Sequence, residues 1–228
     1  MPMMNQSQQP GRIRMQGCLL SCIAPAGVLA GLDSVEDCMK DGDLRSYLGE
    51  MLLHEIMPGM GMSIAGVERL AMQVCRDMEQ PMVRQPIASL MPGALRAWAQ
   101  QALPFLLDFE ARQDRVPPCL CLGLAMLILL FAGARQDAAG QWYCLLDGEK
   151  YPVEEDEEIL SAFLPLSYDM APDMLAYAVL SDRAIWEQDL RDIPGLEDLV
   201  ADQLRDLQLI GLREALKKAA TYWAEAGK

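Results

Sequence analysis

A stretch without charged residues, at positions 116–134, most narrows the folds open to this chain. It lies between Arg115 and Arg135 and begins with Pro117 and Pro118, which suit the first turn of a helix. Its length of 19 residues just reaches what a bilayer-spanning helix needs. A helix that is apolar all round is also found at the centre of a globular core. We interpret the stretch as such a buried core helix.

A second apolar stretch, residues 15–32, follows Arg12 and Arg14 and contains the letters LLSC at positions 19–22. Basic residues, an apolar segment and a cysteine in this order resemble a lipoprotein signal, so one alternative is a membrane-anchored protein. We prefer a buried helix here too, and we expect no association with a membrane.

The composition favours a helical protein and argues against two classes of partner. Hydrophobic residues make up 52% of the 228 residues, aromatic residues only 6%, and 16 residues are methionine, which suits helices packed by Leu, Met and Ala. The net charge of -14 repels phosphate backbones and anionic lipid surfaces. We therefore expect no nucleic-acid partner, and a cytoplasmic protein.

The cysteines do not form the pattern of a metal site. No C-x-x-C pair occurs and His54 is the single histidine, whereas a zinc site needs about four ligands in local pairs. We expect the thiols to act as small buried hydrophobic groups in a reducing compartment. The seven cysteines are Cys18, Cys22, Cys38, Cys75, Cys119, Cys121 and Cys144.

Helical periodicity extends over most of the chain. Residues 1–11 form a polar tail that we expect to be disordered, and residues 12–228 read as a single helical domain. A short helix is expected to start at Ser34. Longer helices are expected at 43–57 capped by Asp43, at 63–79 capped by Ser63, at 95–112 interrupted at Pro104, at 182–190 capped by Ser181, and at 196–226.

One segment, residues 141–153, has the pattern of β-strands. Two short runs flank Asp147-Gly148, which predicts a β-hairpin. The acidic run at 154–158 suits the N-terminus of the next helix, where the helix dipole stabilises negative charge. No G-x-G-x-x-G follows a strand and no phosphate-binding loop occurs, so we expect no dinucleotide-binding domain within this chain.

Several segments, in a fixed order, carry a resemblance to a known family. They are RIRMQGCLLSCIAP at 12–25, GLDSV at 31–35, LHEIMP at 53–58, EQPMVR at 79–84, LPFLL at 103–107, GLAMLI at 123–128, DGEKYPV at 147–153, IWEQDL at 185–190 and IPGL at 193–196. Their order and spacing resemble the C-terminal domain of the mannitol dehydrogenase / tagaturonate (altronate) reductase family, the polyol-specific long-chain dehydrogenases. The residues within these segments favour the tagaturonate reductase branch of the family.

This resemblance implies a fold and an activity. The fold is all-α, a multi-helix globular domain similar to the C-terminal domain of 6-phosphogluconate dehydrogenase, with one small hairpin near 141–153. The family consists of NAD-dependent oxidoreductases, in which the cofactor delivers hydride to a polyol precursor or keto-sugar acid.

The family's catalytic segment, of the form K-x-R-x-L-N-G-x-H-T, is changed in this chain. The acid/base lysine corresponds to Arg12, and the asparagine and histidine that hold the reacting oxygen correspond to Gly17 and Leu20. An arginine stays protonated, and neither glycine nor leucine offers a side-chain hydrogen bond. Arg14 matches the family's arginine. We therefore assign no catalytic residue and regard only Arg12 and Arg14 as candidate substrate-binding groups.

A second family segment, N-S-V-S-K-F-x-x-R-x-L-P, is also changed. Its asparagine, lysine and arginine correspond to Gly93, Ala97 and Gln101. The resemblance implies that this lysine and arginine meet the carboxylate of a sugar acid, so their replacement removes charge-assisted hydrogen bonds to such a substrate.

These departures favour a stand-alone, catalytically inactive homologue of the substrate domain of tagaturonate/altronate oxidoreductase, kept as an interaction or ligand-binding module or as a gene remnant. The alternative is one half of a split NAD-dependent hexuronate or polyol oxidoreductase, with a separate Rossmann subunit that binds the cofactor. We expect this chain alone to bind no cofactor and no metal. We also expect apolar surface near residues 12–20, filled by its own side chains or covered in a homodimer.

Overall fold

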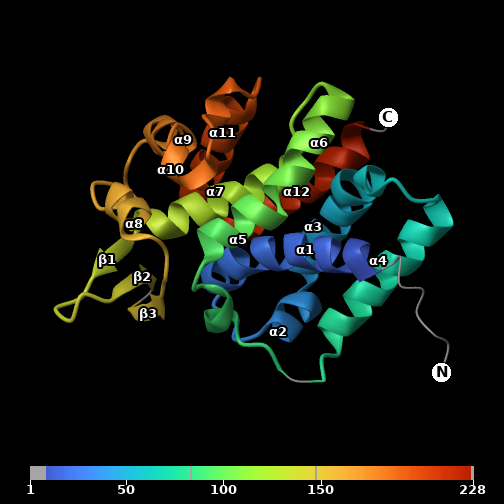
Figure 1. Cartoon of the computed structure of the whole chain (residues 1–228), viewed down its shortest axis with the longest axis horizontal. Helices are drawn as coiled ribbons and strands as arrows, with labels where there is room; N and C mark the ends of the chain where they lie inside the picture. The colour runs from blue at the N-terminus through green and yellow to red at the C-terminus, as the bar shows by residue number, and fades with distance from the viewer. Residues whose placement is uncertain (1–8, 83, 147, 227–228) are drawn as a thin grey trace.

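The computed structural model describes residues 9–82, 84–146 and 148–226, and most of them are helical (Figure 1). The α-helices are α1 (Gln9–Leu29), α2 (Val35–Lys40), α3 (Gly42–Glu50), α4 (Ile64–Glu79), α5 (Ala94–Gln101), α6 (Leu103–Gln113), α7 (Pro118–Ala132), α8 (Glu157–Phe163), α9 (Pro172–Leu180), α10 (Arg183–Trp186), α11 (Leu196–Leu209) and α12 (Gly211–Ala226). A π-helix, η2 (Met51–Ile56), and the 3-10 helices η3 (Met57–Met60), η4 (Ile87–Leu90) and η5 (Leu190–Asp192) join them. The strands are β1 (Ala134–Gln136), β2 (Trp142–Leu146) and β3 (Glu149–Pro152). The helical fold is confirmed.

Helix α7 is the core of the molecule. All 15 of its residues are buried, and α1, α11 and α12 pack against it. Two side chains from other elements donate to carbonyls near its N-terminal end, the Tyr47 hydroxyl to Cys119 at 2.8 Å and the Gln203 amide to Pro118 at 2.7 Å. The interpretation of residues 116–134 as a buried core helix is confirmed. Within the described residues, no helix combines the length and apolar character that crossing a membrane requires.

Helix α1 lies across α7 and starts earlier than expected. It begins at Gln9, so residues 9–11 belong to a helix and not to the predicted tail; residues 1–8 lie outside the described part. Leu19 and Cys22, which raised the lipoprotein alternative, lie in the core with exposures of 2% and 0%. The second apolar stretch is thus also a buried helix.

Helix starts agree with the sequence in some places and not in others. Ser34 and Ser63 cap α2 and α4 through their side chains, as predicted, and the helix at 95–112 breaks before Pro104. Two predicted caps are wrong. Asp41 caps α3 in place of Asp43, and Asp182 caps α10 in place of Ser181, because those carboxylates reach the free backbone N–H groups at 3.1 Å and 2.8 Å.

Two predicted helices are not continuous. The helix expected at 43–57 changes to π-helical winding from Met51 to Ile56, and Asp43 lies in the first turn of α3. The single long helix expected at 196–226 breaks at Ile210, after which Gly211 has a φ of +79°. Glycine adopts this left-handed conformation at no steric cost, which lets α12 turn back across the molecule.

The sheet has three strands, one more than the predicted hairpin. Strands β2 and β3 pair antiparallel as expected, with Cys144 opposite Tyr151, while β1 adds to the other edge of β2 with Ala134 opposite Cys144. Asp147 of the predicted turn lies outside the described residues. Next to the sheet, the Tyr168 ring occupies the space a side chain at Gly133 would need, and its hydroxyl donates to the Leu145 carbonyl at 2.7 Å.

Candidate functional site

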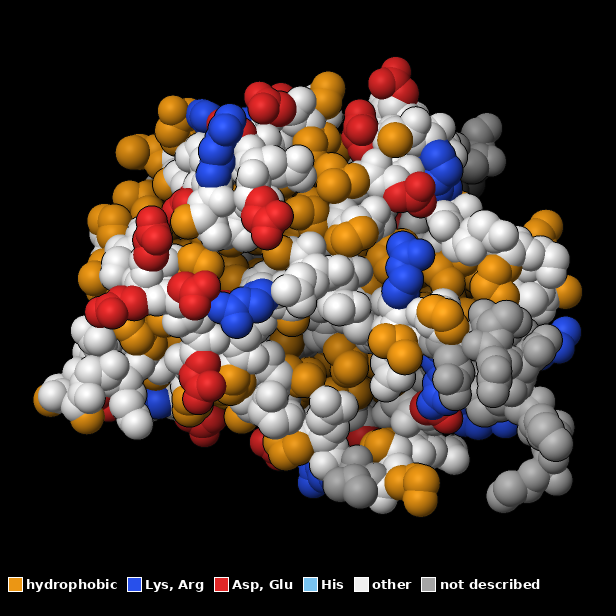
Figure 2. Space-filling model, in the orientation of Figure 1, with side chains coloured by type: hydrophobic (Ala, Val, Ile, Leu, Met, Phe, Trp, Pro, Cys, Tyr) orange, Lys and Arg blue, Asp and Glu red, His pale blue; other side chains and the backbone are white. Residues whose placement is uncertain are grey.

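A groove between α1 and α5 brings together the two segments singled out in the sequence. Its volume is about 380 Å³, and Figure 2 shows hydrophobic side chains near the middle of the face on which these helices lie. Its walls contain Gly17 and Leu20 from the first segment and Ala97 and Gln101 from the second. The other lining residues are Ile13, Gln16, Ser21, Ala24, Leu90 and Ala94.

Helix α5 is fixed in place by contacts at its start and on its buried face. Gly93 precedes it with a φ of +72°, and its N–H donates to the Glu154 carbonyl at 2.8 Å. The Trp98 side chain is fully buried and meets Trp186 edge-on at 5.7 Å. Helix α5 ends at Gln101, shortly before Pro104 in the first turn of α6, and Gln101 lines the groove.

Gly17 and Gln101 face each other across the groove. A methyl carbon at position 17 would lie 2.4 Å from the side-chain oxygen of Gln101, so the glutamine occupies the volume that a larger residue at 17 would need. The Ser21 hydroxyl donates to the Gly17 carbonyl at 2.8 Å and also lies 3.3 Å from the Ala97 carbonyl. The floor of the groove is therefore formed by small residues and closed by one amide side chain.

Arg12 and Arg14 are not lining residues of the groove. Arg12 pairs with Asp77 of α4 at 2.6 Å, and the Arg14 guanidinium lies 5.0 Å from the centre of the Phe105 ring. The lining residues include no charged side chain, so what the groove offers a ligand is apolar contact and the amides of Gln16 and Gln101. Of the residues near 12–20, Ile13 lies at the groove and is 67% exposed, whereas Cys18 and Leu19 are buried in the core.

A buried carboxylate that the sequence did not single out lies at the N-terminus of α7. Glu55, which is 0% exposed, accepts hydrogen bonds from the backbone N–H groups of Cys119 and Leu120 at 2.7 Å and 2.8 Å and from the indole of Trp223 at 3.1 Å. Burial raises the pKa of Glu55 to about 7, although these donors oppose the rise. Its partners are distant in sequence, so local patterns gave no signal for this role.

The thiols lie mostly in the core. Six of the seven cysteines are buried and Cys75 is half-buried. Burial raises the pKa of the Cys22 thiol to about 12, and that of Cys144 to about 12, which keeps them protonated and unreactive near neutral pH. Over the described residues, no three side chains of His, Cys, Asp or Glu are grouped so that they could hold a metal ion.

Comparisons with known proteins point to one group of relatives. No family model matches the chain. Altronate oxidoreductase of Klebsiella pneumoniae strain 342 is 29% identical over 202 residues, which covers 86% of this chain and 40% of that protein. Altronate oxidoreductase of Yersinia enterocolitica is 27% identical over 201 residues, with 86% and 39% covered. The chain thus spans about two fifths of the length of these relatives.

Solved structures agree on the fold. Mannitol 2-dehydrogenase of Pseudomonas fluorescens, in a ternary complex with NAD and D-mannitol, superposes with a TM-score of 0.75 at 12% identity, over 96% of this chain and 42% of that one. Substrate-free D-sorbitol dehydrogenase superposes with a TM-score of 0.67 at 15% identity, over 93% and 41%. The chain is therefore a homologue of the C-terminal part of the altronate oxidoreductases, with the helical fold of the C-terminal domain of mannitol dehydrogenase.

Proposed function

We propose that this chain is a catalytically silent homologue of the substrate domain of altronate oxidoreductase and acts as a binding module. The observation that carries the proposal is the uncharged lining of the α1–α5 groove, in which Gln101 fills the space beside Gly17. Reduction of a keto-sugar acid needs a group that exchanges a proton with the reacting oxygen and a cation for the carboxylate. Neither kind of group lines this groove.

The expected loss of rate is large. The absence of a positioned acid/base typically costs about two to four orders of magnitude, and the absence of a hydrogen-bond donor to the developing oxyanion about two to three more. Arg12 does not replace the lysine, since it stays protonated and is paired with Asp77. A neutral, apolar ligand fits the groove better than a sugar acid does.

We also propose that residues 9–226 alone bind no nicotinamide cofactor, and that the protein is cytoplasmic. The sequence has no glycine-rich turn after a strand, the element that holds a dinucleotide pyrophosphate. Thiols that stay reduced suit a cytoplasmic location, and the seven cysteines form no disulfide among the described residues.

The test combines turnover with ligand binding. The purified chain is mixed with NADH and tagaturonate, and NADH absorbance and thermal unfolding are followed; Klebsiella altronate oxidoreductase serves as the positive control. We expect no loss of NADH, and a shift of the unfolding temperature without turnover would support a binding module. NADH oxidation by this chain alone would contradict the proposal.

A second candidate function is supported by Ile13, whose exposed side chain lies at the groove. In this candidate the groove faces a protein partner, either a Rossmann subunit of a split oxidoreductase or a second copy of the chain. Light scattering of the chain alone, and co-purification with the remaining part of Klebsiella altronate oxidoreductase, separate the two. An association that Ile13→Glu abolishes, and that Ile64→Glu on the exposed face of α4 leaves intact, would favour this candidate.

A further inference from the structure

A second groove lies along α9, and none of its lining residues also lines the α1–α5 groove. Its volume is about 360 Å³. Met174 and Tyr177, three positions apart on one face of α9, line it with side chains that are 60% and 54% exposed. Leu166, Met170 and Ala178 complete its apolar lining. Large apolar side chains left in water next to one another typically mark a binding surface.

The groove is preformed, because α9 is fixed by its opposite face. Leu175 and Leu180 are buried, and α9 packs against α7 and α11. The Arg191 guanidinium lies 4.3 Å from the centre of the Tyr177 ring and donates to the Asp189 carboxylate at 2.6 Å. The exposed side chains therefore stand on a rigid helix, which a partner need not order when it binds.

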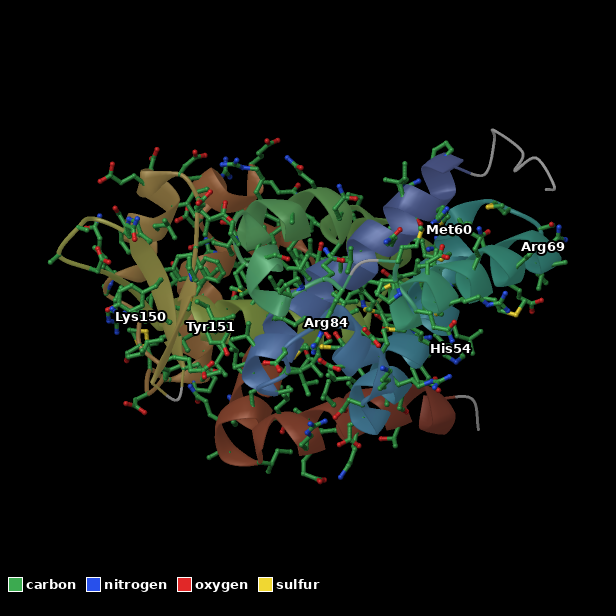
Figure 3. The ribbon with its side chains drawn as sticks, turned by 90° about the horizontal axis from the view of Figure 1, so that it is seen from below. His54, Met60, Arg69, Arg84, Lys150 and Tyr151 are labelled. Atoms are coloured by element: carbon green, nitrogen blue, oxygen red, sulfur yellow. The ribbon has the colours of Figure 1, made fainter. Side chains whose placement is uncertain are left out.

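The charged groups along the groove are acidic. Asp173 of α9 and Glu197 of α11 line it, and no Lys or Arg of the described residues does. Residues 161–209 contain ten Asp or Glu residues against three Arg and no Lys, a net charge of -7 out of the -14 of the chain. Figure 2 shows acidic side chains spread over the surface formed by α8 to α11, with hydrophobic side chains between them. Figure 3 shows Arg69 of α4, an exposed cation, at the end of the molecule opposite the strands, whereas α9 lies at the strand end in Figure 1.

The two carboxylates lie toward opposite ends of the apolar lining. Asp173 is in the first turn of α9, where it shares Arg205 with a second carboxylate, Asp202. Gln208, near the end of α11, donates to backbone carbonyls just before α9. The end of α11 therefore lies beside the start of α9, and the two packed helices run antiparallel. Glu197, in the first turn of α11, lies toward the other end of α9.

We propose that this groove docks a basic amphipathic helix of a partner protein. The apolar side chains of that helix pack on Met174 and Tyr177, and Lys or Arg residues beside its apolar stripe pair with Asp173 and Glu197. Methionine suits such a surface, because its flexible side chain adapts to the shape of a partner. A second copy of the chain fits less well, since two such faces would bring carboxylates together and each copy carries a charge of -14.

Fluorescence anisotropy of a labelled peptide tests the docking on the full chain. The probe is a peptide of leucine and lysine whose leucines recur at helical spacing. One control has glutamate at each lysine position, and the other has the same leucines and lysines in an order without helical periodicity. We expect the leucine–lysine helix to bind at least about tenfold more tightly than either control. No binding of the helix, or equal binding of the reordered peptide through general attraction to the acidic chain, would overturn the proposal.

Substitutions at exposed positions locate the binding. Met174→Ser removes apolar contact area and should weaken binding of the leucine–lysine helix at least about fivefold. Glu197→Gln removes one carboxylate of the groove and should weaken binding about threefold, with a smaller dependence on salt. Met72→Ser and Glu68→Gln make the same two changes on the exposed face of α4 and should leave binding unchanged.

The two methionine variants decide the location, because Met174 and Met72 are exposed to similar degrees, 60% and 64%, and neither replacement disturbs the core. Equal weakening by Met174→Ser and Met72→Ser would contradict α9 as the docking face. Light scattering of the chain without peptide examines the other occupant. A dimer that Met174→Ser dissociates would show that a second copy fills the groove, and would overturn the proposal of a basic partner.

Discussion

The contact between Gly17 and Gln101 shows how two residues at the groove depend on each other. Gln101 fits because position 17 has no side chain, and position 17 is closed to larger residues while Gln101 stays in place. The resemblance placed both residues in segments that differ from the family, but their contact is visible only in three dimensions. The contact between Gly17 and Gln101 is determined by side-chain volume, and the hydrophobic pattern of the sequence does not reveal it.

A double-mutant cycle tests this dependence. Gly17→Ala in a helix should gain about 1 kcal/mol from helix propensity, but the Gln101 side chain must first move away. We expect the gain to be full in the Gln101→Ala background and smaller in the natural background, with a coupling of about 0.5–1 kcal/mol in urea unfolding. Gly49→Ala in α3, where an added carbon meets nothing within 4 Å, should give equal gains in both backgrounds. Additive effects of Gly17→Ala and Gln101→Ala would refute the contact.

Glu187 carries backbone strain, because it is a residue other than glycine in the left-handed region of backbone conformation. Its φ is +63° and its side chain is exposed, so it gains little packing in return. Glu187→Gly should raise the free energy of unfolding by about 1 kcal/mol, measured by urea unfolding. Asp114→Gly, at the other positive-φ residue that is not glycine in the described chain, should gain less because aspartate tolerates this conformation better. The reverse order of the two gains would contradict the assignment of strain.

At the scale of helices, the α7 N-terminus depends on a residue from another element. Pro117 and Pro118 offer no N–H, so the first free donors of the helix are those of Cys119 and Leu120, and Glu55 of η2 accepts from both. A buried carboxylate at a helix N-terminus is stabilised by the helix dipole, yet its burial still raises its pKa. The π-helical turn holds Glu55 at this point.

The raised pKa of Glu55 predicts a dependence of stability on pH. In the folded state the pKa is about 7, above the ordinary value of 4.5, so the folded chain binds this proton more tightly than the unfolded chain. Proton binding by Glu55 therefore adds to the free energy of unfolding in full below about pH 4.5. This stabilisation is lost as pH rises through 7, and the free energy of unfolding falls by about 3 kcal/mol. We expect Glu55→Gln, followed by urea unfolding between these pH values, to lack this fall. Glu68→Gln, at an exposed position of α4, should show the same fall of unfolding free energy with pH as the natural chain. If Glu55→Gln showed that fall too, the assignment to Glu55 would be contradicted.

Sequence patterns predicted those helix boundaries that local chemistry determines. Ser34, Ser63 and Pro104 act through groups within four residues, and all three were placed correctly. The break at Gly211 was missed because the apolar periodicity continues through it; what turns α12 is packing against α3 and α7. Strand β1 was missed for a similar reason, since three residues gain strand character only from pairing with β2.

At the scale of the whole molecule, α12 joins the end of the chain to its first half. Arg213 pairs with Asp41 at the start of α3, and Trp223 donates to Glu55, a residue 168 positions earlier. Helical periodicity in the sequence does not predict these long-range contacts, because it relates only residues that are close in sequence. The resemblance singled out the segments at 12–20 and 93–101, and the fold brings residues of both to the walls of the α1–α5 groove.

Trp223 makes several of the contacts that hold α12 against other parts of the chain. Its ring stacks on His54 at 5.1 Å, meets Phe109 edge-on at 5.8 Å and lies 4.8 Å from the Arg115 guanidinium. Replacement by alanine removes these contacts and leaves Glu55 with one donor fewer, so Trp223→Ala should lower the free energy of unfolding by about 3 kcal/mol in urea unfolding.

Tyr222 provides the matched control, because it is the preceding aromatic residue on the same helix and is 41% exposed. Tyr222→Ala removes an edge contact with Trp223 and should cost less than about 1 kcal/mol. Trp223→Phe keeps a ring against His54 and Phe109 but donates nothing to Glu55, and should fall between the two. Because the lost donor favours the ionised carboxylate, its cost should be greatest above pH 7, where Glu55 is charged. Equal losses for Trp223→Ala and Tyr222→Ala would show that α12 is held by its helix-long packing and not by this indole.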